Sequence, residues 1–267
     1  MTPDLLVLGT LHTLDPERPR AEALLARRGR VLAVGSAREC RAAAAPGARV
    51  LDLAGGSAVP GLADAHGHVL LYARALEEVS LGDAAGEAEC AARAAARARE
   101  LPPGSWVRGR GWDQNRWPGG AYPGAAALDA AVPDHPVLLE RVDGHMAWVN
   151  TRALERAGIG PGTADPPGGR IARDAAGRPT GVLVDAARDL VHAAIPHPPG
   201  PEVERLLRRG LAELARLGLT AVHDAGCTSS VLRTYARLAE ADALPLRVYA
   251  MIDGGQPEGA LRAELAR

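Results

Sequence analysis

The sequence contains no phenylalanine and only three cysteines. Cys40, Cys90 and Cys227 are far apart and form no CxxC motif, which excludes a disulfide framework and favours a reducing compartment. No apolar run approaches the roughly 20 residues that a membrane-spanning helix needs. The N-terminal segment lacks a basic region and its apolar run is short, so no signal peptide is expected. These absences predict a soluble, cytoplasmic protein.

An excess of charge of one sign is also lacking. The formal net charge is −1, and arginines alternate with acidic residues without forming blocks. This balance argues against a nucleic acid or an anionic membrane as the main partner. With 267 residues, 47% of them hydrophobic, the chain is long enough for a substantial core in one large or two ordinary domains.

Hydrophobic patterns divide the first 200 residues into three parts. Residues 1–58 contain short strands with tight turns and predict a small β-sandwich. Residues 59–86 begin with an apolar run at 59–63 that lacks alternation, as expected of a strand buried on both faces, and continue into a helix. Residues 87–200 open with an Ala/Arg helix that we expect to be solvated and then become rich in Gly, Pro and Trp. They indicate an inserted α+β subdomain with a hairpin over 168–187.

The last part, residues 201–267, reads as helix, strand, helix and strand. Its first helix has apolar residues at i, i+3, i+4, i+8, i+11 and i+14 from Val203 to Leu217, which define one face, and Gly218 is placed to end it. The order of elements predicts a parallel α/β sheet or barrel. The final segment, 259–267, reads as a further helix.

The segment VPGLADAHGH, residues 59–68, carries the clearest chemistry. In an extended strand, alternate side chains share a face, so Asp64, His66 and His68 are expected to point the same way. Two imidazoles at this spacing can bind one metal ion at about 2.0–2.1 Å, with Asp64 orienting a histidine from behind. The bare HxH pair is weak evidence in a chain with eight histidines. The alternative is that both are surface or hydrogen-bonded residues.

The compound pattern resembles the first-strand signature of the amidohydrolase superfamily. Further segments resemble its YtcJ-like branch, which is related to N-substituted formamide deformylase: GRGWDQNRWP (109–118), LDAAVPDHPVLLERVDGHMAWVNTRAL (128–154), DPPGGRIARDAAGRPTGVLVDAA (165–187) and GLTAVHDAG (218–226). The resemblance implies an α/β fold in which a small β-sandwich is joined to a metal-dependent (β/α) TIM-like barrel. It also implies hydrolysis of C–N bonds in small, amide-like, non-peptide substrates by metal-activated water.

The resemblance also implies roles for individual residues. His66 and His68 match the first metal ligands, and the metal is expected to be zinc, as one or two ions. Asp185 is the position to test for a later bridging carboxylate, although it could equally cap a helix. His145 is expected to contact substrate or simply to pack in a turn. Trp112 and Asp113 could shape the pocket, and Trp112 could instead belong to the core.

Two further expectations concern a pair of polar residues and the completeness of the barrel. His223 and Asp224 end a later strand, where a structural pair is the favoured interpretation. A full barrel needs eight strand–helix units in about 250 residues, whereas about three barrel strands are recognisable here and the general base has no counterpart. We therefore expect an incomplete barrel and a truncated, inactive form of the enzyme. The alternatives are a non-catalytic module that needs a complementing chain or forms a homo-oligomer, and a lactonase, esterase or cyclic amidase of the same superfamily.

Overall fold

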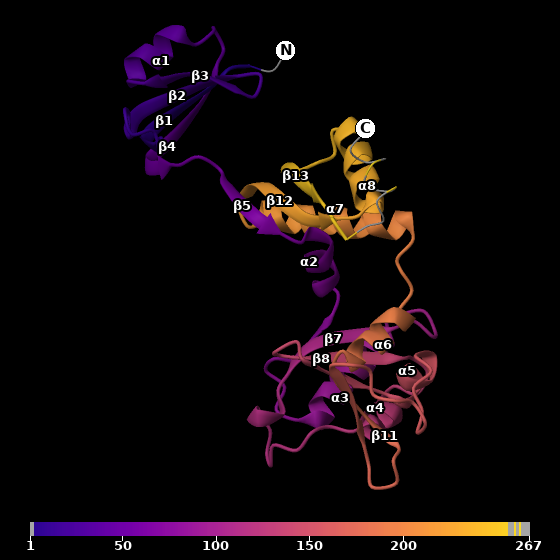
Figure 1. The fold of residues 1–267 in the computed structure, drawn as a ribbon. Coiled ribbons are helices and arrows are strands. Elements are labelled where there is room, and N and C mark those ends of the chain that lie inside the picture. The colour runs from indigo at the N-terminus through magenta and orange to yellow at the C-terminus, as the bar shows by residue number, and fades with distance from the viewer. Residues whose placement is uncertain (1–2, 256–258, 260–261, 263–267) are drawn as a thin grey trace. The chain divides into compact units, whose positions relative to one another are not determined.

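The N-terminal strands form one four-stranded sheet in the computed structural model, which describes residues 3–255, 259 and 262 (Figure 1). The strand order is β3-β2-β1-β4, with β1 antiparallel to β2 and parallel to β4. Side chains of β1 alternate in burial, as the period of two predicts, so Leu6 and Leu8 enter the core. The strands are β1 Leu5–His12, β2 Arg20–Arg27, β3 Arg30–Gly35 and β4 Arg49–Ala58.

A short helix, α1 (Ala37–Ala43), packs against this sheet. It begins with a capping box: the Ser36 hydroxyl accepts the Glu39 N–H, and the Glu39 carboxylate accepts the Ser36 N–H. Cys40 of this helix joins the buried core. Within the described residues these strands make a single sheet with a helix rather than the two facing sheets of a sandwich. Strand patterns alone do not specify which strands face each other.

A second sheet contains the histidine-bearing strand. Its order is β13-β12-β5, with β5 and β12 parallel. Strand β5 begins only at Leu62, because Pro60 offers no N–H for pairing. The prediction of a strand over 59–63, buried on both faces, is therefore wrong in its bounds and burial: Val59 is 60% exposed and Leu62 is 62% exposed. The strands are β5 Leu62–Gly67, β12 Leu219–Cys227 and β13 Arg247–Ile252.

Helices α2 (Val69–Ala75) and α7 (Gly200–Arg216) pack closely through a glycine. A Cβ at Gly210 would lie 3.0 Å from the Cβ of Ala73. The apolar face predicted for α7 is confirmed for Val203, Leu206, Leu207 and Leu211, which are buried, but it is wrong for Leu217 just after the helix, which is 60% exposed. Gly218 follows the helix with a φ of +95°, the left-handed conformation that suits a helix end. Helix α8 covers Ser229–Glu240.

The middle of the chain forms a six-stranded mixed sheet of order β10-β11-β9-β8-β7-β6. The predicted hairpin is confirmed as the antiparallel pair β10 and β11. The strands are β6 Val79–Ser80, β7 Val107–Trp112, β8 Val137–Arg141, β9 Met146–Val149, β10 Gly169–Arg173 and β11 Pro179–Asp185. The helices are α3 Glu87–Ala98, α4 Ala125–Ala131, α5 Thr151–Arg156 and α6 Ala187–Ala194, with a 3-10 turn at Gln114–Arg116.

The expectation that the Ala/Arg helix is merely solvated is corrected by its packing. Cys90, Ala91, Ala94 and Ala98 of α3 are buried in the same core as Trp112. Arginines occupy the opposite side, where Arg93 pairs with Glu89 one turn earlier, as the spacing predicts. Alanine is small enough to pack closely against a sheet, so an Ala-rich face can serve as a core face.

The chain divides into two compact units. One comprises residues 1–67, 212–225 and 243–251, and the other comprises 68–211, 226–242 and the residues from 252 onward. The described residues thus form a mixed α/β structure with three sheets and no closed barrel. Among them, no helix is long and apolar enough to cross a membrane. The helix expected over 259–267 lies almost wholly outside the described residues.

Candidate functional site

Strand β5 carries Asp64 and His66 near its carboxyl end. The Asp64 carboxylate accepts a hydrogen bond from the backbone N–H of His66 at 3.0 Å, which holds the turn of the chain there. Asp64 is half-buried and His66 is exposed. Gly67 follows, and a Cβ at that position would lie 3.1 Å from Val222 of β12, so the close strand packing favours glycine. The two polar side chains therefore lie on an accessible strand end.

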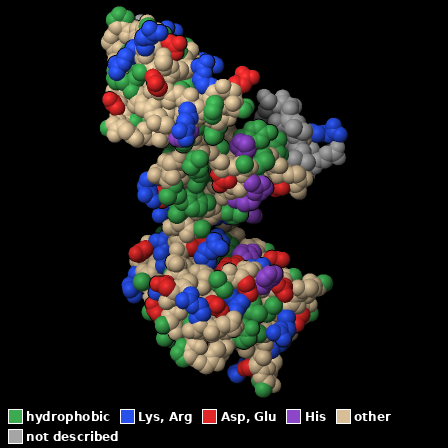
Figure 2. Space-filling view, turned by 90° about the vertical axis from the view of Figure 1, so that its left-hand side faces the viewer, with side chains coloured by type: hydrophobic (Ala, Val, Ile, Leu, Met, Phe, Trp, Pro, Cys, Tyr) green, Lys and Arg blue, Asp and Glu red, His purple; other side chains and the backbone are tan. Residues whose placement is uncertain are grey.

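His68 lies outside the strand. It is the N-cap residue of α2, and its carbonyl accepts the Tyr72 N–H at 2.9 Å. The prediction that one strand face carries both histidines is therefore wrong for His68, because pairing with β12 ends at Gly67. His68 is exposed, as is His66. Histidine side chains are visible on the molecular face drawn in Figure 2.

The neighbouring strand β12 places Asp224 opposite Gly67. Asp224 is only 3% exposed and makes contacts that account for its burial. The ring of His223 packs against that of Tyr249 on β13, with centroids 5.0 Å apart. The contact of His223 with Tyr249 is a packing contact, and the interpretation of His223 and Asp224 as a structural pair stays a prediction.

The donor set does not complete a metal centre. In the part of the chain that the structure describes, no group of three or more His, Cys, Asp or Glu side chains is placed to hold a metal ion. Zinc requires four ligands in a structural site and three protein ligands plus water in a catalytic one. The imidazoles of His66 and His68 would supply two of these, so the residues present do not fit a closed site.

A second polar cluster lies at the ends of β9 and β11. His145 Nδ1 is 2.9 Å from Asp185 Oδ1, and the Asp185 N–H donates to the His145 carbonyl at 2.8 Å. The His145 side chain is 72% exposed and that of Asp185 is 50% exposed, so both are accessible. Helix α6 begins after Ala186 without a side-chain cap, so Asp185 does not serve as a cap.

Asp185 also has a φ of +49°, a conformation that residues other than glycine seldom adopt. Such a conformation costs of order 1 kcal/mol and persists only where the surroundings impose it. Two hydrogen bonds to His145, together with one that the Arg188 side chain donates to the Asp185 carbonyl, hold Asp185 in place. Residues held in this way are concentrated at functional sites.

Arg141, at the end of β8, connects the predicted pocket residues and was not anticipated. Its guanidinium group lies 3.1 Å from the Asp113 carboxylate, donates to the Gln114 side chain at 2.8 Å and pairs with Asp143. Burial by itself raises the pKa of Asp143, but the His145 N–H and the charge of Arg141 outweigh it and leave that pKa below its ordinary value. The only feature of the sequence that pointed to Arg141 was the charged pair Glu140–Arg141 at the end of an apolar strand.

The predicted pocket residues Trp112 and Asp113 occupy different environments. Trp112 is fully buried, donates its indole N–H to the Leu139 carbonyl at 2.8 Å and packs against two other tryptophan rings. It therefore supports the sheet beneath the cluster. Asp113 is partly exposed and accepts the Asn115 N–H, which begins the 3-10 turn. Asp113 thus reaches the cluster through Arg141, whereas Trp112 contributes packing.

Glu140, the neighbour of Arg141, was also missed. It lies 2.7 Å from His192 Nε2 and accepts a hydrogen bond from Arg188 at 2.8 Å. Burial alone raises the pKa of Glu140, but the hydrogen bond and charge of His192, together with Arg188, hold it below the ordinary value. These two contacts join Glu140 of β8 to α6. His192 and Arg188 are too distant from Glu140 in the sequence for the contacts to be predicted from residue spacing.

Comparison with known proteins identifies the class of molecule. The model of the amidohydrolase family matches residues 49–266, and this chain belongs to that family. It is 34% identical over 258 residues to an N-substituted formamide deformylase of Arthrobacter pascens, covering 94% of this chain and 48% of the relative. It is 31% identical over 250 residues to the putative amidohydrolase YtcJ of Bacillus subtilis, covering 91% and 47%. These relatives agree with the resemblance described from the motifs.

The fold is shared with a crystal structure of an uncharacterised metal-dependent hydrolase from Pyrococcus horikoshii. The TM-score is 0.73 at 22% sequence identity, with 93% of this chain and 48% of that chain covered. The chain thus spans about half the length of the relatives that it matches.

Proposed function

We propose that this chain provides the first metal-binding segment of a hydrolase that cleaves C–N bonds in small amide-like substrates. The observation that carries the proposal is the Asp64–His66–His68 motif at the carboxyl end of a parallel strand, in a chain of the amidohydrolase family. His66 and His68 would bind a divalent metal, zinc, and Asp64 would fix the backbone of His66. Such a metal, when bound, polarises a carbonyl group and lowers the pKa of bound water.

The cluster around His145 would bind the substrate. With Asp185 on Nδ1, His145 has Nε2 free to donate or accept a hydrogen bond toward a ligand. Arg141 pairs with Asp113 and with Asp143, and Asp143 accepts the backbone N–H of His145. We favour Asp185 as the residue that positions His145 over its role as a metal ligand, because its carboxylate already accepts that hydrogen bond.

The described chain would be a partial (β/α) barrel that is a poor catalyst by itself. Two imidazoles leave zinc with too few ligands, so we expect weak zinc affinity and negligible hydrolysis. The assay offers an N-alkylformamide, a lactone and a cyclic amide of matched size with added zinc. Zinc-dependent turnover at ordinary enzyme rates would contradict the incomplete site. A preference for the lactone or the cyclic amide would instead favour an esterase-like or cyclic amidase function.

X-ray absorption at the zinc edge tests the metal proposal independently of turnover. We expect two imidazole ligands in the wild-type chain, the remaining ligands being light atoms from solvent, and fewer imidazoles in His66→Ala. A spectrum unchanged by that substitution would contradict the proposal. The three cysteines form no disulfide and are buried, in keeping with the reducing cytoplasm that we propose as the location.

A second candidate function is a module completed by another polypeptide. It is favoured by large apolar side chains that remain exposed in the smaller unit, among them Leu62, Leu217 and Tyr249. Exposed apolar surface of this kind is typical of an interaction site. A chain that folds stably without metal and elutes with a defined partner or as a dimer supports this function. A chain that stays monomeric at high concentration and captures no partner argues against it.

A further inference from the structure

A cavity of about 440 Å³ lies within the larger unit; none of the site residues predicted from the sequence lines it, although His192, the partner of Glu140, does. One part of its wall is apolar, formed by Leu71, Leu101, Trp106 and Ile195. The other part carries charged side chains of both signs. Its arginines are Arg74, Arg97 and Arg108, and its acidic residues include Glu77 and Glu78. A volume of this size suits a small organic molecule, and the combination of apolar wall and charged groups is typical of a binding site.

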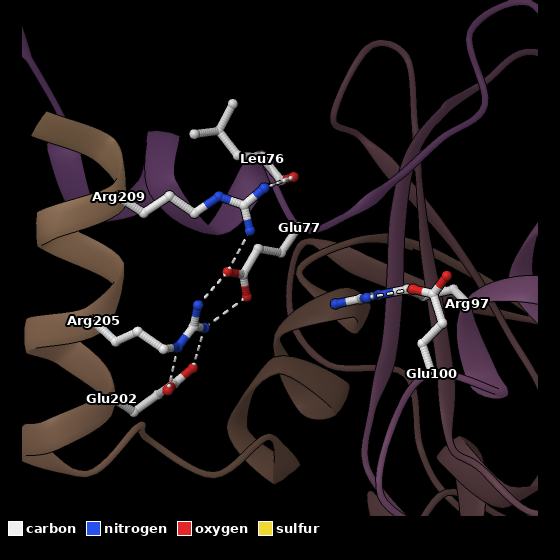
Figure 3. Close-up of polar contacts among 7 residues, drawn as sticks. All are labelled: Leu76, Glu77, Arg97, Glu100, Glu202, Arg205 and Arg209. Atoms are coloured by element: carbon white, nitrogen blue, oxygen red, sulfur yellow. Dashed lines mark hydrogen bonds and ion pairs between the residues drawn. The ribbon is translucent and has the colours of Figure 1, made fainter. Parts of the chain in front are cut away.

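Most of the charged groups in this wall already have partners. Arg108 lies 3.0 Å from the Glu78 carboxylate, and Arg97 pairs with Glu100 at 2.8 Å. Glu77 accepts hydrogen bonds from both Arg205 and Arg209 of α7 (Figure 3). Figure 3 shows the Arg97–Glu100 pair and, apart from it, the contacts of Glu77 with Arg205 and Arg209. The acidic side chains are thereby satisfied and are not available to neutralise a further arginine.

Arg74 is the exception. Its guanidinium group makes no hydrogen bond or ion pair with any described residue, although the side chain is half-buried. Burial lowers the pKa of Arg74, and the nearby charge of Arg108 lowers it further, while Glu78 offsets part of the effect. Arginine remains charged in proteins, so a half-buried guanidinium group without a partner is an unfavourable arrangement that a bound anion would relieve.

A second donor at the cavity is unsatisfied. The indole N–H of Trp106 is shielded from solvent and has no acceptor among the described residues. Leaving such a donor unpaired costs about 1–3 kcal/mol. Arg74 comes from α2 and Trp106 precedes β7, so the two side chains reach the same cavity from independent segments.

We propose that this cavity binds a small organic carboxylate, with its carboxylate group against Arg74 and its apolar body against Leu71, Leu101 and Trp106. A planar guanidinium group suits the two oxygens of a carboxylate, which it can bind through two parallel hydrogen bonds. The apolar wall favours an organic acid over a bare inorganic anion. The cavity shares no residue with the proposed hydrolytic centre, and binding there does not depend on a metal.

Equilibrium dialysis of the full chain with radiolabelled benzoate, in EDTA at low salt, tests this proposal. EDTA removes any metal at His66 and His68, so the result does not depend on the hydrolytic function. We expect benzoate to bind and Arg74→Gln to weaken its binding by at least about tenfold, the effect of losing a hydrogen bond to a charged group. Arg74→Lys keeps the charge and should retain part of the affinity. Arg97→Gln is the matched control, because Arg97 lines the same cavity but is paired with Glu100.

Two competing ligands complete the experiment. Benzamide has the shape of benzoate without its charge and should compete at least about tenfold more weakly, whereas inorganic phosphate tests the charge without the apolar body. Equal competition by benzamide, or benzoate binding that Arg74→Gln leaves unchanged in a variant with wild-type circular dichroism, would overturn the proposal. Stronger binding of phosphate than of benzoate would contradict the organic class of the ligand. Absence of benzoate binding at millimolar concentration would also overturn it.

Discussion

His145 Nδ1 and Asp185 Oδ1 lie 2.9 Å apart, and the Asp185 N–H donates in return to the His145 carbonyl. The two residues are forty positions apart in the sequence and meet where β9 and β11 end side by side. This reciprocal pair holds an exposed imidazole in one orientation while keeping Asp185 in a left-handed backbone conformation. The favourable hydrogen bonds thus offset a conformational cost at an accessible position.

Asp185→Gly separates these two contributions. Glycine adopts a positive φ without strain, so the backbone should gain about 1 kcal/mol of stability, while the hydrogen bond to His145 is lost. We expect the free energy of unfolding, measured in urea, to change little. Asp242→Gly is the matched control, because Asp242 has a φ of +50° and follows helix α8, and it should gain the full amount. Equal gains in both variants would show that the pair with His145 contributes nothing.

Local patterns were sufficient to predict most elements of the chain. The short strands of residues 1–58, the first part of the apolar face from Val203 and the hairpin of β10 and β11 each depend on neighbouring residues, and each is confirmed. The family was likewise predictable, because its motifs are contiguous stretches of sequence. Whether the predicted ligands bind metal stays a prediction.

What could not be predicted depends on contacts between distant segments. Arg141 meets Asp113 across two adjacent strands, and nothing in the spacing of these residues requires it. The exposure of Leu62 depends on whether another layer covers β5, which an apolar run does not determine. The backbone conformation of Asp185 was also missed, because aspartate at the end of a strand gives no signal of a positive φ.

The N-terminal sheet should lose stability in acid through Asp4. This buried carboxylate accepts two hydrogen bonds from Arg27, at 2.7 and 2.6 Å, and one from the Ala45 N–H, and they lower its pKa to about 2. Its ordinary value in an unfolded chain is about 3.9. Because the pKa of Asp4 is lower in the folded chain, its carboxylate stabilises the fold at pH values above the pKa in the unfolded chain. This contribution is lost as pH falls from about 4 to about 2. Hydrogen exchange of the β1 amides across this range measures the loss.

Asp4→Asn is the diagnostic variant for this pH dependence. It cannot ionise, so protection of the β1 amides should be lower at pH 6 and nearly constant down to pH 2. Glu39, whose pKa is lowered by its capping hydrogen bonds with Ser36, accounts for a smaller remaining dependence. An acid-induced loss of protection in Asp4→Asn as steep as in the wild type would refute the assignment to Asp4.

Glu77 should stabilise the packing of α2 on α7. Its carboxylate follows α2 and accepts hydrogen bonds from Arg205 at 2.6 and 2.8 Å and from Arg209 at 2.8 Å (Figure 3). The side chain is 19% exposed, so screening by water is incomplete. Glu77→Gln should lower the free energy of unfolding by about 1–2 kcal/mol, less at high salt.

Glu202→Gln is the control for this effect. Glu202 also binds Arg205, but both residues belong to α7 and the pair is more exposed. Pairs of this kind contribute about 0.3–0.5 kcal/mol. A loss in Glu202→Gln equal to that in Glu77→Gln would show that the contact between the helices carries no special weight.

Gly61 should be indispensable to the pairing of β5 with β12. A Cβ at this position would lie 2.2 Å from the Thr220 hydroxyl oxygen and 2.8 Å from its Cβ, so the strands would have to separate. Gly61→Ala should cost about 1–3 kcal/mol by overpacking, measured by urea unfolding. Adding Thr220→Gly should recover most of that loss. Gly160→Ala, at a site with no atom within 4 Å of the new Cβ, should be close to neutral.

Calorimetric titration of the chain with zinc tests the central claim most directly, because the proposed function depends on His66 and His68 as ligands. We predict one weakly bound ion per chain, with affinity reduced at least about tenfold by His66→Ala and by His68→Ala. His197→Ala, which removes an exposed histidine elsewhere, should leave the affinity unchanged. Zinc binding that both substitutions at residues 66 and 68 leave intact would contradict the assignment of the metal site and the hydrolytic function that depends on it.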